Sequence, residues 1–328
     1  MAYFLLNSTR FGQLYSCDKL TYDQWEKYTE KRPVLGSICL TIGVLNVITN
    51  VLSLIIIKRE PFFKNSCYKI MFVHGIIDIV ASICISLITG ILMIRGSAYC
   101  LQPNFQYIVG CFIEATWFGN CIICNVLALN RVIDFWSPNL SMDLFDGYKI
   151  NFWISLVFLY SLFGFFFASP IFLNSKRVMF MYDPYILVPL DVLPIDRSVY
   201  VGPVNDWNNY ILIPGMVFIY AGLVVSIFRK SHAVQHQRTW QIKVIIQALV
   251  LCMIVFIPGF IFILFNFFHL PRYFLHIDLL TFEIGNGGSG IIILILNKTI
   301  RREVWALLKA AVTRKQSTLV TTISSVHA

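Results

Sequence analysis

Long apolar stretches alternate with short polar segments along most of this 328-residue chain. Each stretch has about the 20 residues that an α-helix needs to cross a bilayer. We place these stretches at residues 34–57, 67–94, 105–131, 148–172, 209–228, 241–268 and 275–297. The pattern predicts an all-α membrane protein folded as a seven-transmembrane helix bundle, with its two termini on opposite sides of the membrane.

The seven stretches differ in clarity. Residues 244–268 contain no charged side chain, so the sixth span is the best defined. The seventh is interrupted by Glu283 and by four glycines, which are Gly285, Gly287, Gly288 and Gly290. Because glycine weakens a helix, six spans is the main competing count.

Composition supports the membrane assignment. Hydrophobic residues make up 57% of the chain and charged residues 13%, and the mean hydropathy is +0.71. A soluble domain could not hide so much apolar surface from water.

Positive charge orients the bundle, because lysine and arginine near the ends of spans stay in the cytoplasm. They gather in the loops after the first and fifth spans and after the seventh: Lys58, Arg59, Lys64, Arg229, Lys230, Arg238, Lys298, Arg301, Arg302, Lys309, Arg314 and Lys315. The N-terminus is therefore expected outside, although residues 1–33 mix five basic with four acidic side chains. The net charge of +9 then indicates a cytoplasmic face beside anionic membrane lipid, and no nucleic-acid partner is expected.

These observations divide the chain into four parts. Residues 1–33 form an extracellular N-terminal segment and residues 34–298 the seven-transmembrane domain. In 299–312, apolar side chains recur every three or four residues from Ile300 to Ala311, which predicts a short interfacial eighth helix. Residues 313–328 are rich in serine and threonine, as is typical of a disordered tail. Phosphorylation and arrestin binding are one interpretation of this tail, and a segment without a specific role is the other.

Two of the nine cysteines stand apart. Seven lie within or at the ends of spans, where a small apolar side chain packs well. Cys17 is instead in the outer N-terminal segment and Cys100 in the outer loop before the third span, both in an oxidising compartment. We predict a disulfide between them, with two free thiols as the alternative. Asn7, in Asn7-Ser8-Thr9, is the match to the glycosylation pattern on the outer side.

Polar side chains inside a bilayer are costly, so those present indicate function. Asp78 lies in the middle of the second span, with Asn50 in the first and Asn120 in the third, and we expect them to form a polar core. Asn120 precedes Arg131 by eleven residues, or three helical turns, so both face the same direction, with Arg131 at the cytoplasmic mouth. The alternative is that these side chains only join helices by hydrogen bonds.

This spacing resembles that of rhodopsin-like G-protein-coupled receptors. The resemblance implies that Asn50, Asp78 and Asn120 form a site for sodium or water and that Arg131 takes part in G-protein coupling. No other metal site and no cofactor is expected.

Proline and aromatic residues extend the comparison to the sixth span. Phe256-Ile257-Pro258 is similar to the aromatic-x-Pro of the sixth helix of such receptors, which makes an outward swing of this span mechanically feasible, with a packed kink as the alternative. Above it we expect an apolar ligand pocket lined by Glu114, Trp117, Phe256, Phe260 and Glu283.

A closer resemblance is to the nematode serpentine receptors of class T, a family of chemoreceptor type. Several motifs carry it, among them Ser66-Cys67-Tyr68-Lys69-Ile70-Met71 leading to Gly75-Ile76-Ile77-Asp78, Leu129-Asn130-Arg131, Tyr182-Asp183-Pro184-Tyr185, and Leu296-Asn297-Lys298-Thr299-Ile300-Arg301. Two departures stand out. Asn130 takes the place of the usual acid before Arg131, and Ser289-Gly290 stands where a proline is usual.

The resemblance implies a chemosensory receptor for an unknown small molecule that signals through a heterotrimeric G protein by outward movement of the sixth span. It also implies a multi-pass protein of the plasma membrane, with the sensory cilium as a candidate location. A seven-helix transporter or ligand-gated ion channel is the alternative, since buried acids also line ion paths. An opsin is excluded, because the seventh span has no lysine for a Schiff base.

An enzyme is not expected. The side chains that could build a metal hydrolase lie at two different depths in the membrane, with His74 and Asp78 at one and His269, His276 and Asp278 at the other.

Overall fold

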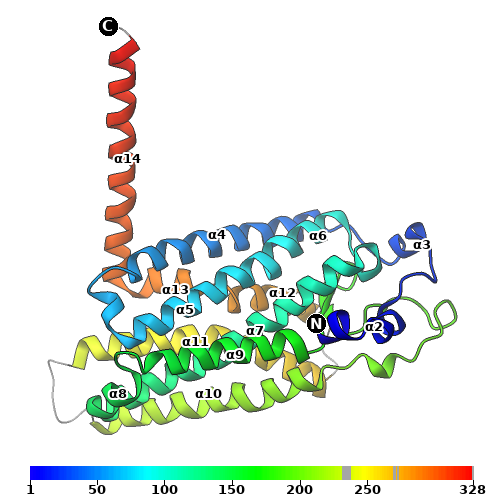
Figure 1. Ribbon diagram of the computed structural model, residues 1–328, viewed down its shortest axis with the longest axis horizontal. Helices are drawn as coiled ribbons and strands as arrows, with labels where there is room; N and C mark the ends of the chain where they lie inside the picture. Colours follow the sequence, from blue (N-terminus) through cyan, green and yellow to red (C-terminus); the bar gives the residue numbers. More distant parts are fainter. Residues whose placement is uncertain (231–237, 269–270, 272, 327–328) are drawn as a thin grey trace.

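A computed structural model describes residues 1–230, 238–268, 271 and 273–326, so His269 lies outside the described residues. Long helices run side by side and the N-terminal segment covers one end of the bundle, while the C-terminal helix leaves from the other (Figure 1). We call these the outer and the inner end.

Within the described residues, six helical spans are each long and apolar enough to cross a membrane. They are α4 (Pro33–Ile57), α5 with η2 and α6 (Ser66–Ala81, Ser82–Ile88 and Thr89–Arg95), α7 (Pro103–Trp136), α9 (Ile150–Phe167), α10 (Pro203–Lys230) and α11 (Arg238–Phe267). A bent pair, α12 (Tyr273–Gly285) and α13 (Ser289–Leu296), makes the seventh span, with a bend of 66° between its halves. The prediction of a seven-helix bundle is confirmed.

Short elements connect the spans. At the outer end these are α1 (Ala2–Leu6), α2 (Ser8–Tyr15), α3 (Tyr22–Glu26), η3 (Tyr99–Leu101), β1 (Phe172–Asn174), β2 (Met179–Met181) and η4 (Arg197–Val199). At the inner end they are η1 (Phe62–Lys64) and α8 (Pro138–Phe145), followed after the seventh span by α14 (Lys298–Val326). The strands pair antiparallel, with Leu173 opposite Phe180, and form a hairpin at the outer end.

Helix α7 is the centre of the bundle. In the most apolar 18-residue stretch of α7, 72% of the residues are buried inside the protein. The corresponding share for α9, at the periphery of the bundle, is 17%. The outward side chains of α9 are large and apolar, as with Phe152, Phe158 and Leu159, which are all more than 60% exposed. Such a surface is stable only against lipid, so the exposed apolar faces of the spans agree with a membrane setting.

Three differences from the sequence prediction stand out. The fourth span ends at Phe167 rather than at residue 172, because Pro170 follows and the residue before a proline disfavours the helical conformation. The second span contains a π-helical segment, η2, which apolar periodicity does not reveal.

The third difference is at the C-terminus. Helix α14 continues to Val326, past the expected end at Val312, because residues 313–326 contain no proline or glycine to stop it. Ile300 and Val304, on its first turns, are buried against the bundle, and the helix then runs across the direction of the spans (Figure 1).

Candidate functional site

A cavity of about 500 Å³ opens within the outer half of the bundle. Helix α7 contributes Ile113, Glu114 and Trp117 to its wall, and the β-hairpin covers it with Met179, Phe180 and Met181. The rest of the lining comes from α10, α11, α12 and the outer loops: Ile171, Arg177, Tyr182, Tyr200, Val201, Gly202, Asn205, Asp206, Asn209, Pro258, Phe262, Phe265, Phe268, Leu275, Asp278 and Phe282. The cavity is mostly aromatic, with a few polar groups at defined positions, which is the usual construction of a small-molecule site.

Trp117 is fixed at the inner side of this cavity. It is 4% exposed, and its indole N–H donates to the Oδ1 of Asn209 on α10 at 2.9 Å. Its ring centroid lies 5.6 Å from that of Phe282 on α12. Trp117 therefore links three spans, α7, α10 and the first half of the seventh.

The structure brings two of the five expected pocket residues into the lining, Glu114 and Trp117. The rings of Phe256 and Phe260 stack on each other with centroids 5.4 Å apart, and neither residue lines the cavity. Phe260 is 44% exposed on the surface of the bundle. Glu283 is buried against α4 and η2, close to Cys39 and Ser86. Helix α11 instead presents Pro258, Phe262 and Phe265 to the cavity, so the face that it turns inward differs from the one that the sequence suggested.

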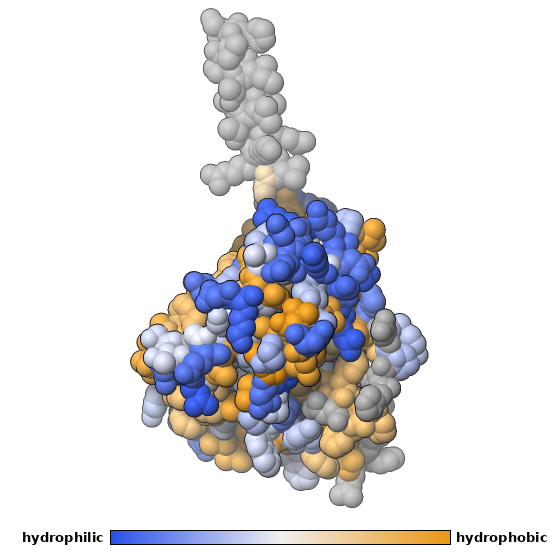
Figure 2. Space-filling model, turned by 90° about the vertical axis from the view of Figure 1, so that its right-hand side faces the viewer, coloured by the Kyte–Doolittle hydropathy of each residue, from blue (hydrophilic) through white to orange (hydrophobic). Residues whose placement is uncertain are grey.

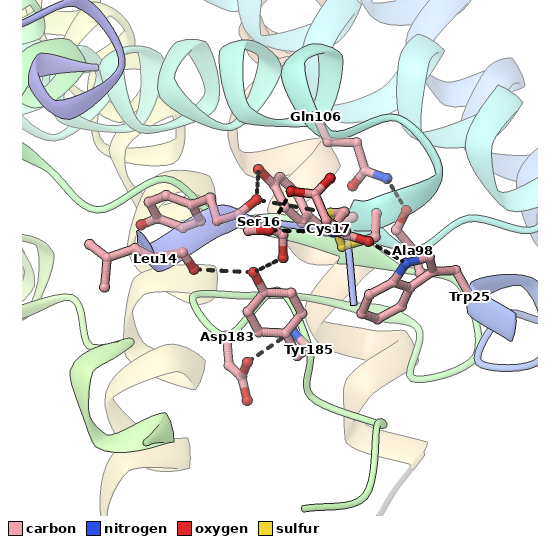
Figure 3. The surroundings of a disulfide bond; sticks show 12 residues. Leu14, Ser16, Cys17, Trp25, Ala98, Gln106, Asp183 and Tyr185 are labelled. Carbon is pink, nitrogen blue, oxygen red and sulfur yellow. Dashed lines mark hydrogen bonds between the residues drawn. A yellow bond between two sulfur atoms is a disulfide. The ribbon is translucent and has the colours of Figure 1, made fainter. Parts of the chain in front are cut away.

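The predicted disulfide between Cys17 and Cys100 is confirmed. It joins the N-terminal segment to the loop before α7 and lies in a cluster of buried aromatic side chains (Figure 3). The indole N–H of Trp25 donates to the Cys17 carbonyl at 3.1 Å, and the hydroxyl of Tyr185 donates to the Ser16 carbonyl at 2.8 Å. The N-terminal segment is thus bonded to the outer loop as well as cross-linked.

This outer cap reaches the cavity through Tyr200, whose ring lines the cavity and whose hydroxyl donates to the Leu14 carbonyl at 2.6 Å. Asn7, the expected glycosylation site, is exposed and caps α2 by accepting the N–H of Arg10 at 3.0 Å. Figure 2 looks onto this outer face, where hydrophilic residues surround a smaller hydrophobic area.

Below the cavity, polar side chains gather at the break between α12 and α13. The backbone N–H of Ser289, at the start of α13, donates to the Oδ2 of Asp78 at 3.1 Å, and its hydroxyl donates to the Oδ1 of Asn50 at 2.9 Å. Asn50 in turn donates to the Gly287 carbonyl at 2.7 Å. Asn120 donates to the side chain of Asn286 at 3.1 Å. All three expected core residues therefore bond to the seventh span.

The geometry differs in detail from the expected core. Among the described residues, neither Asn50 nor Asn120 bonds directly to Asp78, whose other oxygen lies 3.6 Å from the Nε2 of His74. A broken helix frees backbone groups that lipid cannot satisfy, and Asn46, Asn50 and Asp78 supply partners for them. These side chains consequently hold the break in place, whatever else they bind.

Glycine makes this contact possible. A Cβ on Gly287 would lie 2.3 Å from the Ser82 Oγ and 2.5 Å from the Asn46 Nδ2. The glycines that made the seventh span the weakest by sequence are thus the residues that let α4 and η2 approach its break. Ser289, Asn286, Asn46 and His74 were not assigned to the polar core from the sequence, although their polarity within apolar stretches was a signal.

Arg131 lies at the inner end of α7 and is 4% exposed. Its guanidinium forms an ion pair with the carboxylate of Asp134 at 3.2 Å and donates to the side chain of Asn130. Asp134, three residues later on the same helix, thus pairs with Arg131 although the preceding residue is not acidic. The sequence suggested no partner for this arginine.

A second group of hydrogen bonds holds the inner end together. Asn297, just after α13, donates to the Oε1 of Gln247 on α11 at 3.1 Å and to the hydroxyl of Tyr68 on α5 at 3.2 Å. Gln247 is 3% exposed. We call Gln247, Asn297 and Tyr68 the inner clasp, because they join the sixth span to the second and seventh.

An outer cavity, a central polar network and a buried arginine at the inner end, all within seven helices, define a receptor of the G-protein-coupled type. Comparison with known proteins agrees, since residues 1–317 match the family model described as serpentine type 7TM GPCR chemoreceptor Srt. The chain belongs to this family. It is also 22% identical over 309 residues to serpentine receptor class T-55 of Caenorhabditis elegans, covering 93% of this chain and 83% of that relative. The protein is therefore a membrane-embedded chemoreceptor-type receptor, not an enzyme, and the transporter or channel alternative is not favoured.

Proposed function

We propose that this receptor binds an extracellular small molecule in the outer cavity and activates a heterotrimeric G protein at its inner end. The observation that carries this proposal is that the same spans form both ends. Helices α7 and α11 and the seventh span line the cavity through Trp117, Pro258 and Phe282. The same spans hold, or end beside, Arg131, Gln247 and Asn297 at the inner end.

A ligand can act on the inner end through the break in the seventh span. Phe282 lines the cavity, contacts Trp117 and lies three residues before the end of α12. A ligand that moves Phe282 changes the angle between α12 and α13. Because α13 is followed directly by Asn297, such a change pulls on its hydrogen bond to Gln247.

Outward movement of α11 is the expected result. Gln247 is the contact of the inner clasp on α11, so its bond to Asn297 must open before the inner half of that helix can leave α5 and α13. Opening uncovers the buried Arg131 to a G protein. The ligand needs only to bind the open arrangement more tightly than the closed one to shift the population.

The remaining parts of the chain fit this function. Asn50, Asp78 and Asn120 line a network in which water or sodium can bind, and the first turns of α14 form an interfacial eighth helix against membrane lipid. Residues 313–328 offer serine and threonine side chains for phosphorylation and arrestin binding. We place the receptor in the plasma membrane, with its N-terminus outside and Asn7 glycosylated, and the sensory cilium as its candidate site.

The proposal is tested by nucleotide exchange on purified G protein, with the receptor reconstituted in vesicles that contain no other receptor. A panel of small amines, alcohols and carboxylates serves as the ligand source. We expect at least one compound to accelerate exchange severalfold and Arg131→Ala to abolish the acceleration. Arg95→Ala is the matched control, because Arg95 is exposed at the outer end and its removal leaves the inner end unchanged.

Thermal unfolding of each variant separates loss of signalling from loss of folding. An Arg131→Ala receptor that is folded, binds the compound and still accelerates exchange would contradict the proposal.

A further inference from the structure

Carboxyl groups outnumber basic groups in the outer cavity. Glu114 on α7, Asp206 on α10 and Asp278 on α12 line it from three different helices, whereas Arg177 is the one basic residue in its described lining. Arg177 is exposed, at the turn of the β-hairpin, and Glu114 is only 2% exposed. The negative groups thus extend into the bundle while the positive group stays at the mouth.

Glu114 is a buried acid that has no ion-pair partner among the described residues. Among the residues that the structure describes it forms no ion pair, and its Oε2 has no hydrogen-bond partner. Burying a carboxyl group in an apolar wall without a partner is costly, and a positive charge supplied from outside offsets that cost. The geometry therefore leaves a position for a cation or a strong hydrogen-bond donor beside Glu114.

A second acid acts on the same part of the cavity. Burial, reinforced by the negative charges of Glu114 and Asp206, raises the pKa of Tyr182, which lines the cavity from the outer loop. The two carboxyl groups are thus close enough to the same phenol to influence it together. The hydroxyl of Tyr182 accepts a hydrogen bond from Asn205 at 2.6 Å, which fixes the ring at this place.

Aromatic rings surround these acids. Trp117, Tyr182 and Phe282 lie in the lining together with Phe262 and Phe265 of α11. The faces of aromatic rings attract cations and also bury apolar groups. A volume of about 500 Å³ holds a compact organic molecule rather than a bare metal ion or a peptide.

We propose that the ligand of this cavity is a small organic cation, a protonated or quaternary amine whose charge pairs with Glu114 and Asp206 and whose apolar body lies against Trp117 and Phe282. This inference rests on the proposed function, since it names the ligand class of the same site.

The test measures binding alone, by thermal unfolding of the purified full-length receptor in lipid nanodiscs. Four probes of similar shape are compared: 2-phenylethylamine, phenyltrimethylammonium, 2-phenylethanol and 3-phenylpropanoate. We expect the two cations to raise the melting temperature in a concentration-dependent way, and the alcohol and the carboxylate to have no effect at equal concentration.

Glu114→Gln keeps the shape of the side chain and removes its charge, so the apparent affinity for both cations is expected to fall at least tenfold. Glu60→Gln is the matched control, since Glu60 is 66% exposed in the first inner loop and its removal is expected to leave binding unchanged. If Glu114→Gln does not fold, Glu114→Asp replaces it as a variant that keeps the charge and is expected to bind both cations. The selectivity of the wild-type receptor for the amine over the alcohol then decides whether the ligand class is correct.

Equal stabilisation by the alcohol, stabilisation by the carboxylate alone, full affinity of Glu114→Gln for the cations, or no stabilisation by either cation would each overturn the inference. Because this assay does not involve a G protein, its result is separate from the proposed function. A receptor that binds the cations without activating a G protein supports the ligand class and contradicts the signalling proposal, and a receptor activated only by anions does the reverse.

Discussion

Replacing Gly290 with alanine should destabilise the receptor, although alanine is the better helix former. Gly290 is the second residue of α13 and packs against α4. A Cβ there would lie 2.4 Å from the backbone nitrogen of Asn50, 2.6 Å from the carbonyl carbon of Thr49 and 2.7 Å from the Cα of Asn50. All three are backbone atoms, which cannot rotate away as a side chain can.

The magnitude follows from these distances. Ordinary van der Waals contact begins near 3.4 Å, so α13 and α4 must separate by about 1 Å. Overpacking of this kind costs about 1–3 kcal/mol. The separation also stretches the hydrogen bonds of Ser289 to Asp78 and Asn50, now 3.1 and 2.9 Å, each with a net value of about 1 kcal/mol or more. Alanine returns about 1 kcal/mol of helix propensity, so we expect a net loss of about 2 kcal/mol.

Thermal unfolding of Gly290→Ala, purified in the same nanodiscs, measures this loss. Gly222→Ala in α10 is the matched control, because a Cβ at Gly222 meets no atom within 4 Å and should leave stability unchanged or improved. A Gly290→Ala receptor as stable as the Gly222→Ala control would refute the packing argument, and with it the role of this glycine in bringing α4 to the break.

Two further predictions concern the ends of the bundle. Replacing Cys17 and Cys100 together by serine removes a cross-link between residues 83 positions apart. The chain-entropy value of this cross-link is about 4.5 kcal/mol. The N-terminal segment of the variant should therefore be cleaved at a protease concentration that leaves the wild type intact. Equal resistance of the two proteins would show that the aromatic contacts of the cap suffice. Gln247→Leu removes the bond to Asn297, worth about 1 kcal/mol, and should raise ligand-independent nucleotide exchange about fivefold. Unchanged basal exchange would mean that the inner clasp does not hold α11.

The spans and the disulfide could be predicted because each depends on a local or compartmental rule. A segment of about 20 apolar residues has few alternatives to a membrane helix. Cys17 and Cys100 were the two cysteines on the outer side, so their pairing required no knowledge of the packing. Apolar length also placed the broken seventh span correctly, although its glycines gave no indication of the bend.

The ligand cavity was harder to predict, because a span faces lipid on one side and protein on the other and both faces are apolar. Phe256 and Phe260 on α11 illustrate this, since their sequence pattern does not tell which side of the helix turns inward. Glu114 was recognisable because an acid must avoid lipid. Arg177 and Tyr182 were not, since the outer loops position them only in the folded protein, and Asp206 lies in the first turn of α10, before the predicted start of the fifth span at residue 209.

The polar residues at the break between α12 and α13 were likewise predictable only in part. Asp78 and Asn50 were identifiable as costly side chains in apolar spans. That Ser289 would be their shared partner depends on the 66° bend between α12 and α13, which the sequence pattern does not reveal. The ion-pair partner of Arg131 is Asp134, one helical turn later. It was not predicted because only the position before Arg131 was compared with the receptor pattern.

The central claim is that a ligand in the outer cavity controls G-protein activation at Arg131. Ligand-stimulated nucleotide exchange in receptor-only vesicles tests it most directly, with current across the same membranes recorded in parallel. We predict exchange that rises severalfold with ligand, is lost in Arg131→Ala and is kept in Arg95→Ala, without any current. A ligand-gated current that persists in the absence of G protein, with no effect on exchange, would contradict it.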